Sequence, residues 1–241
     1  MTAARLRRDS RAGRRDWRAV RAHLDFHGWA RLPGLLTRTE CEALRRLFDD
    51  DARFRSTIVM EKRAYGSGTY RYFKEPLPPL VRRLRRTLYP PLAIAARAWA
   101  ERTGSDPGAY PNTFAAFRER CHDAGQLRPT PLLLRYRAGD WNALHQDTYG
   151  AIAFPLQVLV PLSARIREYE GGEVLLVEQR PRAQSRGTAL CVEQGDGLVF
   201  TNRERPVRGS RGDYRVAVRH GVSTVTRGER TTLGIIFHDA E

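Results

Sequence analysis

Apolar residues in the first half of the chain recur at the spacing of an α-helix. Between Trp17 and His27 they lie three or four positions apart, so they share one face of a helix that Gly28 should end. A second helix is expected after Thr37. Thr37 and Glu40 have the spacing of a capping box, in which each side chain binds the other residue's backbone N–H.

Two further helical stretches are expected before the middle of the chain. Residues 80–88 alternate apolar residues with arginines at helical spacing. Pro90 and Pro91 should end that helix and begin another, which runs to Gly104. Residues 113–124 form a last predicted helix. The first half therefore reads as a layer of helices.

After Gly125 the pattern changes to short runs of β-forming residues separated by turn residues. Many short strands at this spacing predict a sandwich or jelly roll. We therefore expect one domain over residues 17–241, with a helical support region over 17–125 and a β-core over 126–241, after a basic tail over 1–16. The expected strands are residues 132–136, 154–162, 173–177, 198–201, 215–222 and 231–237.

The chain is long enough to enclose such a core, and it is strongly basic. Of its 241 residues, 41% are hydrophobic, and the formal net charge is +15. Lys62 and Lys74 are the only lysines, so arginine supplies nearly all of the positive charge. A charge of this size favours polyanionic partners such as nucleic acid. The alternative is a well-solvated surface on an enzyme with a small-molecule substrate, and composition does not decide between the two.

Cysteine spacing and hydropathy limit where the protein is expected to work. Cys41, Cys121 and Cys191 form no C-x-x-C pair, which argues against a zinc knuckle or a disulfide framework and indicates buried thiols in a reducing compartment. The apolar stretch at residues 91–100 contains Arg97 and is shorter than the ~20 residues of a membrane helix. The arginine-rich N-terminus lacks the apolar segment of a secretory signal. We expect a cytoplasmic protein with no membrane span.

His145 and Asp147 are the first chemical clue. Residues two positions apart in an extended strand point to the same face, so an imidazole and a carboxylate at this spacing can bind one metal ion. His220 lies in a later β-forming segment and can add a third ligand from a neighbouring strand. Two histidines and one carboxylate leave one side of the metal open, which suits non-haem Fe(II). Each residue alone is more typical of a structural position; the combination favours a metal site.

Arg230 and Thr232 follow His220 on another predicted strand, where they share a face. A guanidinium and a hydroxyl can converge there on one carboxylate, and Tyr136 can add its phenol from the strand before His145. A buried arginine is costly without an anionic partner, so an enclosed Arg230 would indicate an anion site. The alternative is an exposed arginine at the end of a strand.

These motifs, in this order, resemble the 2-oxoglutarate/Fe(II)-dependent dioxygenase superfamily, in particular its prolyl-4-hydroxylase-like branch. The wider pattern is similar to a bacterial family of 2-oxoglutarate/Fe(II) oxygenases linked to damaged nucleic acid. The resemblance covers most of residues 132–238 and implies a mainly β fold with supporting helices: a double-stranded β-helix (jelly roll) core preceded by an α-helical N-terminal region. The segments that carry it are Arg135-Tyr136, Leu144-His145-Gln146-Asp147, the strand Gln157 to Leu162, Glu170-Gly171-Gly172-Glu173, Gly195-Asp196-Gly197-Leu198-Val199-Phe200 and residues 220–232.

The resemblance also implies a reaction and a role for each candidate residue. The enzyme would use Fe(II), 2-oxoglutarate and O₂, with ascorbate as an optional stimulant, to hydroxylate a C–H bond and release succinate and CO₂. Hydroxylation of an N-methyl group would demethylate a damaged base. The implied iron ligands, which are also the catalytic residues, are His145, Asp147 and His220. The residues implied to bind the distal carboxylate of 2-oxoglutarate are Arg230, Thr232 and Tyr136.

Five residues are candidates for contact with the substrate. Tyr70 and Tyr72 lie in a segment that interleaves aromatic residues with cations and could stack a flipped base; the alternative is packing in the core. Tyr149 follows the metal motif and is either a pocket residue or a packing residue. Arg180 and Arg182 begin an arginine-rich region that could follow phosphates, or that is simply a set of solvated turns.

Three functions remain open at this point. The first is a dioxygenase that acts on nucleic acid, such as a repair demethylase. The second is a prolyl-4-hydroxylase-like enzyme with a protein substrate, or a hydroxylase of small molecules. The third is a metal-free β-barrel that binds nucleic acid. The complete set of ligands and the placement of Arg230 argue against the third.

Overall fold

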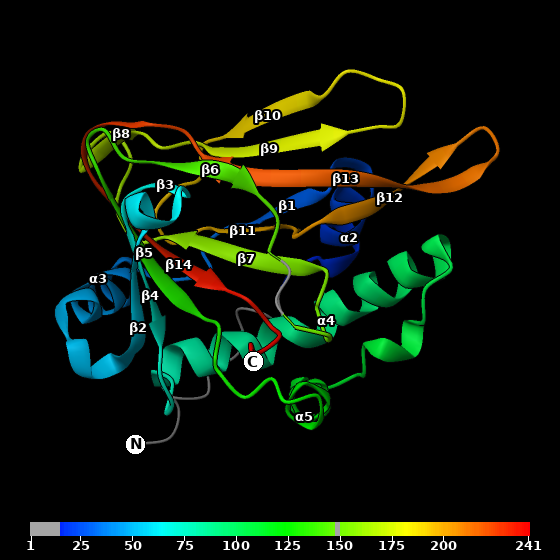
Figure 1. Cartoon of the computed structure of the whole chain (residues 1–241), viewed down its shortest axis with the longest axis horizontal. Coiled ribbons are helices and arrows are strands. Elements are labelled where there is room, and N and C mark those ends of the chain that lie inside the picture. Colours follow the sequence, from blue (N-terminus) through cyan, green and yellow to red (C-terminus); the bar gives the residue numbers. More distant parts are fainter. Residues whose placement is uncertain (1–14, 148–149) are drawn as a thin grey trace.

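The computed structural model describes residues 15–147 and 150–241. Two antiparallel β-sheets face each other, and the long helix α4 lies on the far side of the larger sheet (Figure 1). This arrangement confirms the predicted fold class of a jelly-roll core with supporting helices. Most of the expected basic tail, residues 1–14, and the candidate Tyr149 lie outside the described residues.

The larger sheet has the strand order β1-β11-β7-β14-β5-β4-β2, and β8 pairs with β14 beside it. Its neighbours come from distant parts of the chain: Trp29 in β1 pairs with Phe200 in β11. Such long-range pairing holds both ends of the sequence in one sheet. The strands are β1 (Trp29–Leu32), β2 (Phe54–Val59), β4 (Thr69–Phe73), β5 (Leu132–Arg137), β7 (Leu156–Pro161), β8 (Tyr169–Gly171), β11 (Gly197–Thr201) and β14 (Val225–Ile235).

The smaller sheet has the order β10-β9-β13-β6-β3, and β12 pairs with β13. The hairpins β9–β10 and β12–β13 project beyond the core on the same side of the molecule (Figure 1). The strands are β3 (Gly66–Ser67), β6 (Trp141–His145), β9 (Val174–Gln179), β10 (Arg186–Leu190), β12 (Glu204–Gly209) and β13 (Gly212–Val222).

Within residues 15–147 and 150–241, four α-helices support the sheets: α2 (Trp17–His27), α3 (Arg38–Arg46), α4 (Pro79–Thr103) and α5 (Phe114–Asp123). The predicted boundaries of α2 are confirmed, and Gly28 ends that helix with φ +78°. Both hydrogen bonds of the predicted capping box between Thr37 and Glu40 are present at the start of α3. Among the described residues, none of the helices combines the length and the apolar character needed to cross a bilayer.

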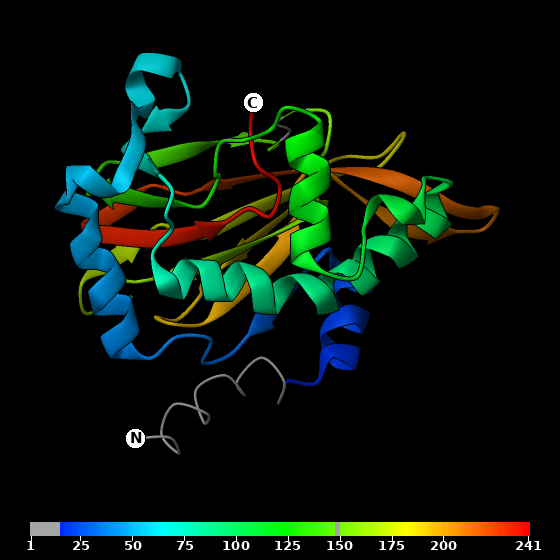
Figure 2. The ribbon, with the colours of Figure 1, turned by 90° about the horizontal axis from the view of Figure 1, so that it is seen from below.

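The main core lies between α4 and the larger sheet, and Figure 2 shows α4 running across that sheet. Its centre is Tyr89, which is fully buried. The ring of Tyr89 lies 5.1 Å from that of Phe117, 5.0 Å from that of Phe154 and 6.0 Å from that of Phe237. These contacts join α4, α5 and the sheet into one packed layer, so the opposite face of the sheet is left to form the site.

The expectation of a purely helical support region over residues 17–125 is wrong in part. Strands β1, β2, β3 and β4 all lie in this region, and β4 pairs with β5 in the larger sheet. These strands are short, and their partners lie far along the chain, so local periodicity carries little trace of them. The six strands expected after Gly125 are all present, with four additional ones: β6, β8, β10 and β12.

The predicted break at Pro90 and Pro91 is also wrong, because α4 continues through both prolines. A proline within a helix removes a backbone hydrogen bond and crowds the preceding turn, at a cost of ~3 kcal/mol. Here Leu88, Tyr89 and Leu92 are fully buried on either side of the prolines. Burial of large apolar side chains stabilises by about 1.5–3 kcal/mol each, so packing of the continuous helix offsets the cost.

Candidate active site

A cavity of about 270 Å³ lies between the two sheets, on the side of the larger sheet away from α4. Residues from both sheets line it. Tyr70, Tyr72 and Tyr136 come from β4 and β5, while His145 and His220 come from β6 and β13. The cavity therefore brings together residues as far apart in sequence as Tyr65 and Ile236.

The predicted ligands His145, Asp147 and His220 meet on the wall of this cavity. One potential ligand atom from each residue lies within 4.8 Å of the other two. His220 Nε2 is 3.0 Å from Asp147 Oδ2, and His145 Nε2 is 3.5 Å from Asp147 Oδ1. Asp147 and His220 are buried, and His145 is partly exposed. Pairing of β6 with β13 sets His145 directly opposite His220 and so creates the cluster.

A β-bulge orients His145. His220 pairs with His145 and Val222 pairs with Asn142, so β6 has one more residue than β13 over this interval. Gly221 makes room for the bulge, because a β-carbon there would lie 2.7 Å from the backbone oxygen of Asn142. The distortion turns the imidazole of His145 so that its Nδ1 lies 2.8 Å from the backbone oxygen of Ala143. With Nδ1–H donating to that carbonyl, Nε2 is free to bind a metal.

The chemistry of this donor set fits a divalent transition metal. Burial and the neighbouring His220 lower the pKa of His145, so its imidazole is neutral and presents a lone pair at neutral pH. Two imidazoles and one carboxylate, arranged around one point with a cavity on the other side, form the ligand pattern of non-haem Fe(II) sites. The predicted ligands thus fit the metal that the sequence implied.

Gln157 is part of this cluster, although the sequence analysis assigned it no role. Its Nε2 lies 2.8 Å from Asp147 Oδ2 and 3.1 Å from His220 Nε2. Gln157 is only 6% exposed and comes from β7 of the larger sheet, so its side chain reaches the ligands from across the cavity. The one available signal is an amide within an otherwise apolar strand, Leu156 to Pro161.

Arg230 lines the same cavity from β14 and is 1% exposed. Its Nε and Nη1 are buried and make no hydrogen bond to the described residues, and no carboxylate of those residues lies within ion-pair distance. The guanidinium of Arg230 also interacts with Tyr169. A buried cation without a counter-ion in the protein indicates a site for an anion.

Tyr136 and Thr232 lie close to Arg230 in the sheet. Tyr136 pairs with Arg230 across β5 and β14, and the guanidinium carbon lies 5.5 Å from the centre of its ring. Burial raises the pKa of Tyr136 to about 12, so the phenol keeps its proton and can donate it to an anion. Thr232 is fully buried and its hydroxyl has no partner among the described residues, but it is not one of the residues that line the cavity.

The candidate substrate residues fall into two groups. Tyr70 and Tyr72 line the cavity and meet edge to face, with ring centres 5.5 Å apart. Arg55 stacks on Tyr72, with its guanidinium carbon 4.5 Å from the ring centre. Arg180 and Arg182 instead belong to the β9–β10 hairpin and are not among the residues lining the cavity.

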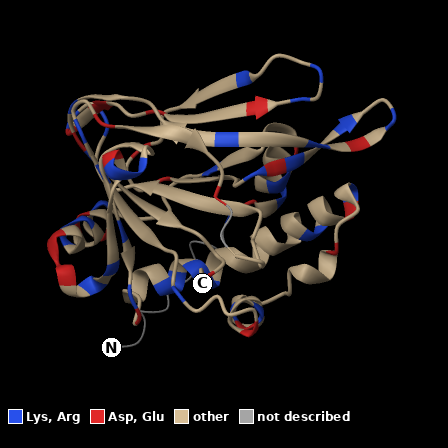
Figure 3. Ribbon diagram, viewed as in Figure 1, with Lys and Arg blue, Asp and Glu red and all other residues tan. Residues whose placement is uncertain are grey.

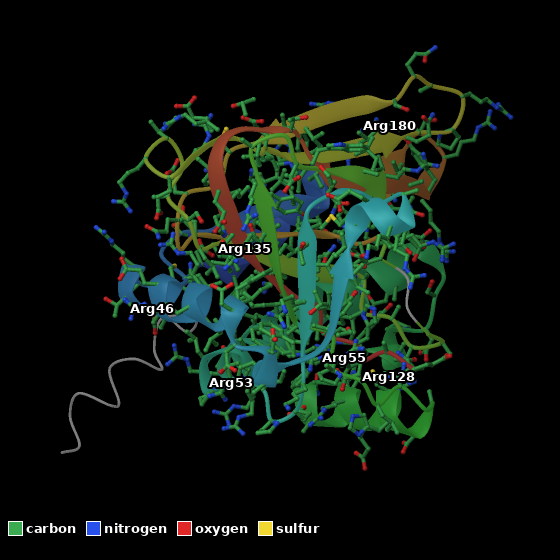
Figure 4. All side chains as sticks on the ribbon, turned by 60° about the vertical axis from the view of Figure 1, so that its left-hand side comes forward. Arg46, Arg53, Arg55, Arg128, Arg135 and Arg180 are labelled. Carbon is green, nitrogen blue, oxygen red and sulfur yellow. The ribbon has the colours of Figure 1, made fainter. Side chains whose placement is uncertain are left out.

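Basic residues are spread over several elements rather than gathered on one. Figure 3 shows blue positions on both projecting hairpins as well as on α3 and α4. Near the cavity, Arg55 and the exposed Arg128 lie side by side, whereas Arg180 lies at the far end of the same view (Figure 4). Arg180 is held by Glu178, with Nε 2.8 Å from Oε1. Arg55 therefore lies next to the aromatic wall that Tyr70 and Tyr72 form, and Arg128 lies close to Arg55.

Comparison with known proteins identifies related sequences. The Oxygenase-NA family model, described as an oxygenase catalysing oxidative methylation of damaged DNA, matches residues 68–240. Two uncharacterized proteins of Mycobacterium tuberculosis, from strains CDC 1551 and H37Rv, are 53% identical to this chain. That similarity extends over 168 residues, which are 70% of this chain and 72% of each relative.

Solved structures share the fold at low sequence identity. A prolyl-4-hydroxylase from Pseudomonas putida is 15% identical, with a TM-score of 0.52 over 93% of this chain and 99% of that one. An oxidoreductase of the 2OG-Fe(II) oxygenase family from Burkholderia pseudomallei is 16% identical, with a TM-score of 0.50 over 94% of this chain and 93% of that one. At these identities the likeness concerns the arrangement of helices and strands.

Proposed function

Because this chain belongs to the Oxygenase-NA family, we propose that it is an Fe(II)- and 2-oxoglutarate-dependent dioxygenase that oxidises damaged DNA. One observation carries the proposal. The ligand atoms of His145, Asp147 and His220 meet within 4.8 Å on the wall of a cavity that the buried Arg230 also lines. A metal site and an anion site in one enclosed space are what chelation of a dicarboxylate such as 2-oxoglutarate requires.

In this proposal His145, Asp147 and His220 hold Fe(II). Bound Fe(II) and 2-oxoglutarate together supply the activation of O₂ that hydroxylation of a C–H bond needs. The protein's own part is to orient and shield. The β-bulge between β6 and β13 aims His145, and the two sheets bury Asp147 and His220 between them.

Arg230 would bind the distal carboxylate of 2-oxoglutarate. Its planar guanidinium makes two parallel charge-assisted hydrogen bonds to a carboxylate, and such bonds are stronger in a buried site. Tyr136 adds a phenolic donor on the same side, since its proton is retained at neutral pH. Thr232, whose buried hydroxyl has no partner among the described residues, would supply a third donor.

Oxidation of a methylated base would remove the methyl group. O₂ and 2-oxoglutarate convert the N–CH₃ group to N–CH₂OH, with release of succinate and CO₂. The hemiaminal then breaks its C–N bond and leaves as formaldehyde, while the ring nitrogen regains a proton. Asp147 supplies the third protein ligand of the proposed metal site. A site in which a carboxylate of the protein fills this position is consistent with hydroxylation.

The aromatic wall supports a nucleic-acid substrate. A base taken out of the stack can lie against Tyr70 and Tyr72, and base–aromatic stacking contributes about 1–3 kcal/mol per base. Arg55 lies on Tyr72 and Arg128 lies close to Arg55, where phosphates flanking the base would pass. Arg180 and Arg182 lie farther away on the β9–β10 hairpin and would contact only phosphates more distant in the strand.

Anaerobic addition of Fe(II) and 2-oxoglutarate tests the enzyme class. We expect a visible charge-transfer absorption that needs both components, and consumption of 2-oxoglutarate when O₂ is admitted. A protein that binds neither would instead support a metal-free β-barrel that binds nucleic acid.

A succinate-release screen tests the substrate. It compares methylated oligonucleotides, proline-rich peptides and small metabolites, and we expect stimulation by the oligonucleotides. Stimulation by the peptides alone would favour a prolyl-4-hydroxylase-like activity, and by the metabolites alone a small-molecule hydroxylase.

Salt dependence tests the proposed phosphate contacts. Replacement of both Arg55 and Arg128 by alanine should reduce the slope of log K against log salt by about 0.7 for each phosphate of single-stranded DNA that is no longer neutralised. Arg86→Ala is the matched control, because Arg86 is exposed on α4, on the other side of the larger sheet. Equal slopes for the double variant and the control would remove Arg55 and Arg128 from the interface.

A further inference from the structure

We infer that Gln157 is a positioning residue, whose side-chain amide holds Asp147 so that the carboxylate binds the metal through one oxygen only. The inference rests on the proposed function, because it concerns the metal that His145, Asp147 and His220 would hold. Gln157 begins a segment that is part of the family resemblance, but the resemblance assigns it no role. Its role follows from the sheet that carries it and from the atoms that it reaches.

The amide of Gln157 is directed at the ligands. Its Nε2 donates to Asp147 Oδ2 over 2.8 Å and lies 3.1 Å from His220 Nε2. Only the NH₂ side of the amide suits this contact, because a carboxylate oxygen is an acceptor. The amide also supplies a link from the larger sheet to ligands that come from β6, β13 and the loop after β6.

Apolar packing alone does not explain why a glutamine occupies position 157. Its neighbours in β7, Leu156 and Val158, are 0% and 1% exposed, and Gln157 itself is 6% exposed. A polar side chain buried in such a strand costs about 1–3 kcal/mol unless it is hydrogen-bonded. This buried amide donates a hydrogen bond to Asp147, and it also lies next to His220.

A hydrogen bond to one carboxylate oxygen affects how the other can bind. An octahedral Fe(II) site with two histidines and a one-oxygen carboxylate keeps three open positions. Two are needed for 2-oxoglutarate and one for O₂. A carboxylate that binds through both oxygens would occupy one of the three. Because Gln157 engages Oδ2, it disfavours that second mode and leaves the third position open.

The first test measures metal affinity by titration of the 2-oxoglutarate-free protein with Mn(II). Gln157→Met keeps an unbranched side chain of similar length but has no donor. Gln157→Asn keeps the amide but is one methylene too short to reach Asp147. We expect both variants to bind Mn(II) about 10–100-fold more weakly than the wild type, the usual effect of losing a partner that orients a ligand. The metal-induced gain in stability should fall by about 1.4–2.7 kcal/mol accordingly.

Gln194→Met is the matched control. Like Gln157, Gln194 donates a hydrogen bond from its side-chain amide. Its acceptor is the backbone oxygen of Leu162 at 2.7 Å, and Gln194 does not line the cavity. We expect wild-type Mn(II) affinity for this variant. The unfolding temperature of each metal-free variant reports general damage to the fold, so a loss of affinity in a normally folded Gln157→Asn protein cannot be ascribed to misfolding.

The visible spectrum of the Co(II)-loaded protein gives a second readout that a purely structural role would not move. The spectrum depends on the number and arrangement of ligands, so a change in how Asp147 binds the metal should alter it in the Gln157 variants and not in Gln194→Met. Wild-type affinity together with a wild-type Co(II) spectrum in both Gln157 variants would overturn the inference. A wild-type chain that binds no Mn(II) or Co(II) would overturn the proposed function itself, which is a separate outcome.

Discussion

Gly172 lies against the side chain of Arg230 so closely that a β-carbon at position 172 would come within 2.7 Å of Arg230 Cδ. Gly172 also has φ +63°, a conformation that other residues adopt at a cost of roughly 1–2 kcal/mol. The glycine therefore creates the space in which the buried guanidinium sits. The same Glu-Gly-Gly-Glu segment was one of the motifs on which the sequence resemblance rests.

Gly172→Ala should displace the Arg230 side chain and weaken the binding of 2-oxoglutarate. We expect an increase of about tenfold or more in the apparent dissociation constant, equivalent to ~1.4 kcal/mol. The measurement is a titration of the Fe(II)-loaded protein with 2-oxoglutarate under anaerobic conditions.

Gly187→Ala is the control, because a β-carbon at position 187 in β10 would meet no heavy atom within 4 Å. We expect an unchanged affinity for 2-oxoglutarate in this variant. If Gly172→Ala also binds 2-oxoglutarate normally, Arg230 does not need the space, and the assignment of the anion site loses its support.

Replacement of His145, Asp147 or His220 by alanine should abolish metal binding and 2-oxoglutarate turnover. Each change removes one of the three proposed metal ligands and leaves the apolar core beside α4 unchanged. Metal titration and succinate release measure the effect, and circular dichroism checks the fold. His27→Ala is the control, because His27 is exposed and outside the cavity. Iron-dependent succinate release that persists in both His145→Ala and Asp147→Ala would falsify the ligand assignment.

Arg230→Met should raise the requirement for 2-oxoglutarate by about 100-fold or more, since two charge-assisted hydrogen bonds of about 1.5–3 kcal/mol each are removed. Arg230→Lys keeps the charge but not the planar fork, so its effect should be intermediate. The apparent KM for 2-oxoglutarate is the measurement, and Arg211→Ala on the exposed β12–β13 turn is the control.

The same substitution makes a second, independent prediction about stability. Arg230 is a buried cation with no carboxylate partner among the described residues. Replacing it with methionine should therefore leave the 2-oxoglutarate-free protein as stable as the wild type, or more so. A large loss of stability in Arg230→Met would mean that the guanidinium is a structural element and that its apparent lack of an anion is misleading.

Acidification should destabilise the protein through His238, which is fully buried and accepts a hydrogen bond from the backbone N–H of Phe154. Burial lowers the pKa of His238 to about 4. Between this value and 6.5 the unfolded chain binds the proton and the folded chain does not, so the free energy of unfolding rises with pH across this window and is level above it. The slope should be at most about 1.4 kcal/mol per pH unit.

Denaturant unfolding of the wild type and His238→Asn over this pH range measures the effect. The wild type should lose up to about 3 kcal/mol that the variant does not lose, because the shift spans roughly two and a half pH units. Other buried groups, such as His145, are common to both proteins and cancel in the difference. Parallel stability curves for the two proteins would show that His238 is not protonated on unfolding.

Local signals in the sequence were sufficient for most helices, and they pointed to candidate metal ligands whose side chains lie together in the structure. The cap of α3 depends on residues three positions apart, and α2 ends at the glycine that the pattern indicated. His145, Asp147, His220 and Arg230 could be found because their types and order are distinctive. Interactions between residues that are close in sequence, such as helix caps, can be predicted from the types of residue at neighbouring positions.

Pairing between distant segments was not visible in the same way. Strands β1 to β4 lie in a region that looks helical, and α4 passes through two prolines because of what it packs against rather than its own propensity. Gln157 becomes significant only when β7 faces β6 and β13 across the cavity. The free energy of such contacts depends on which surfaces meet in three dimensions, and a linear pattern of residues does not contain that information.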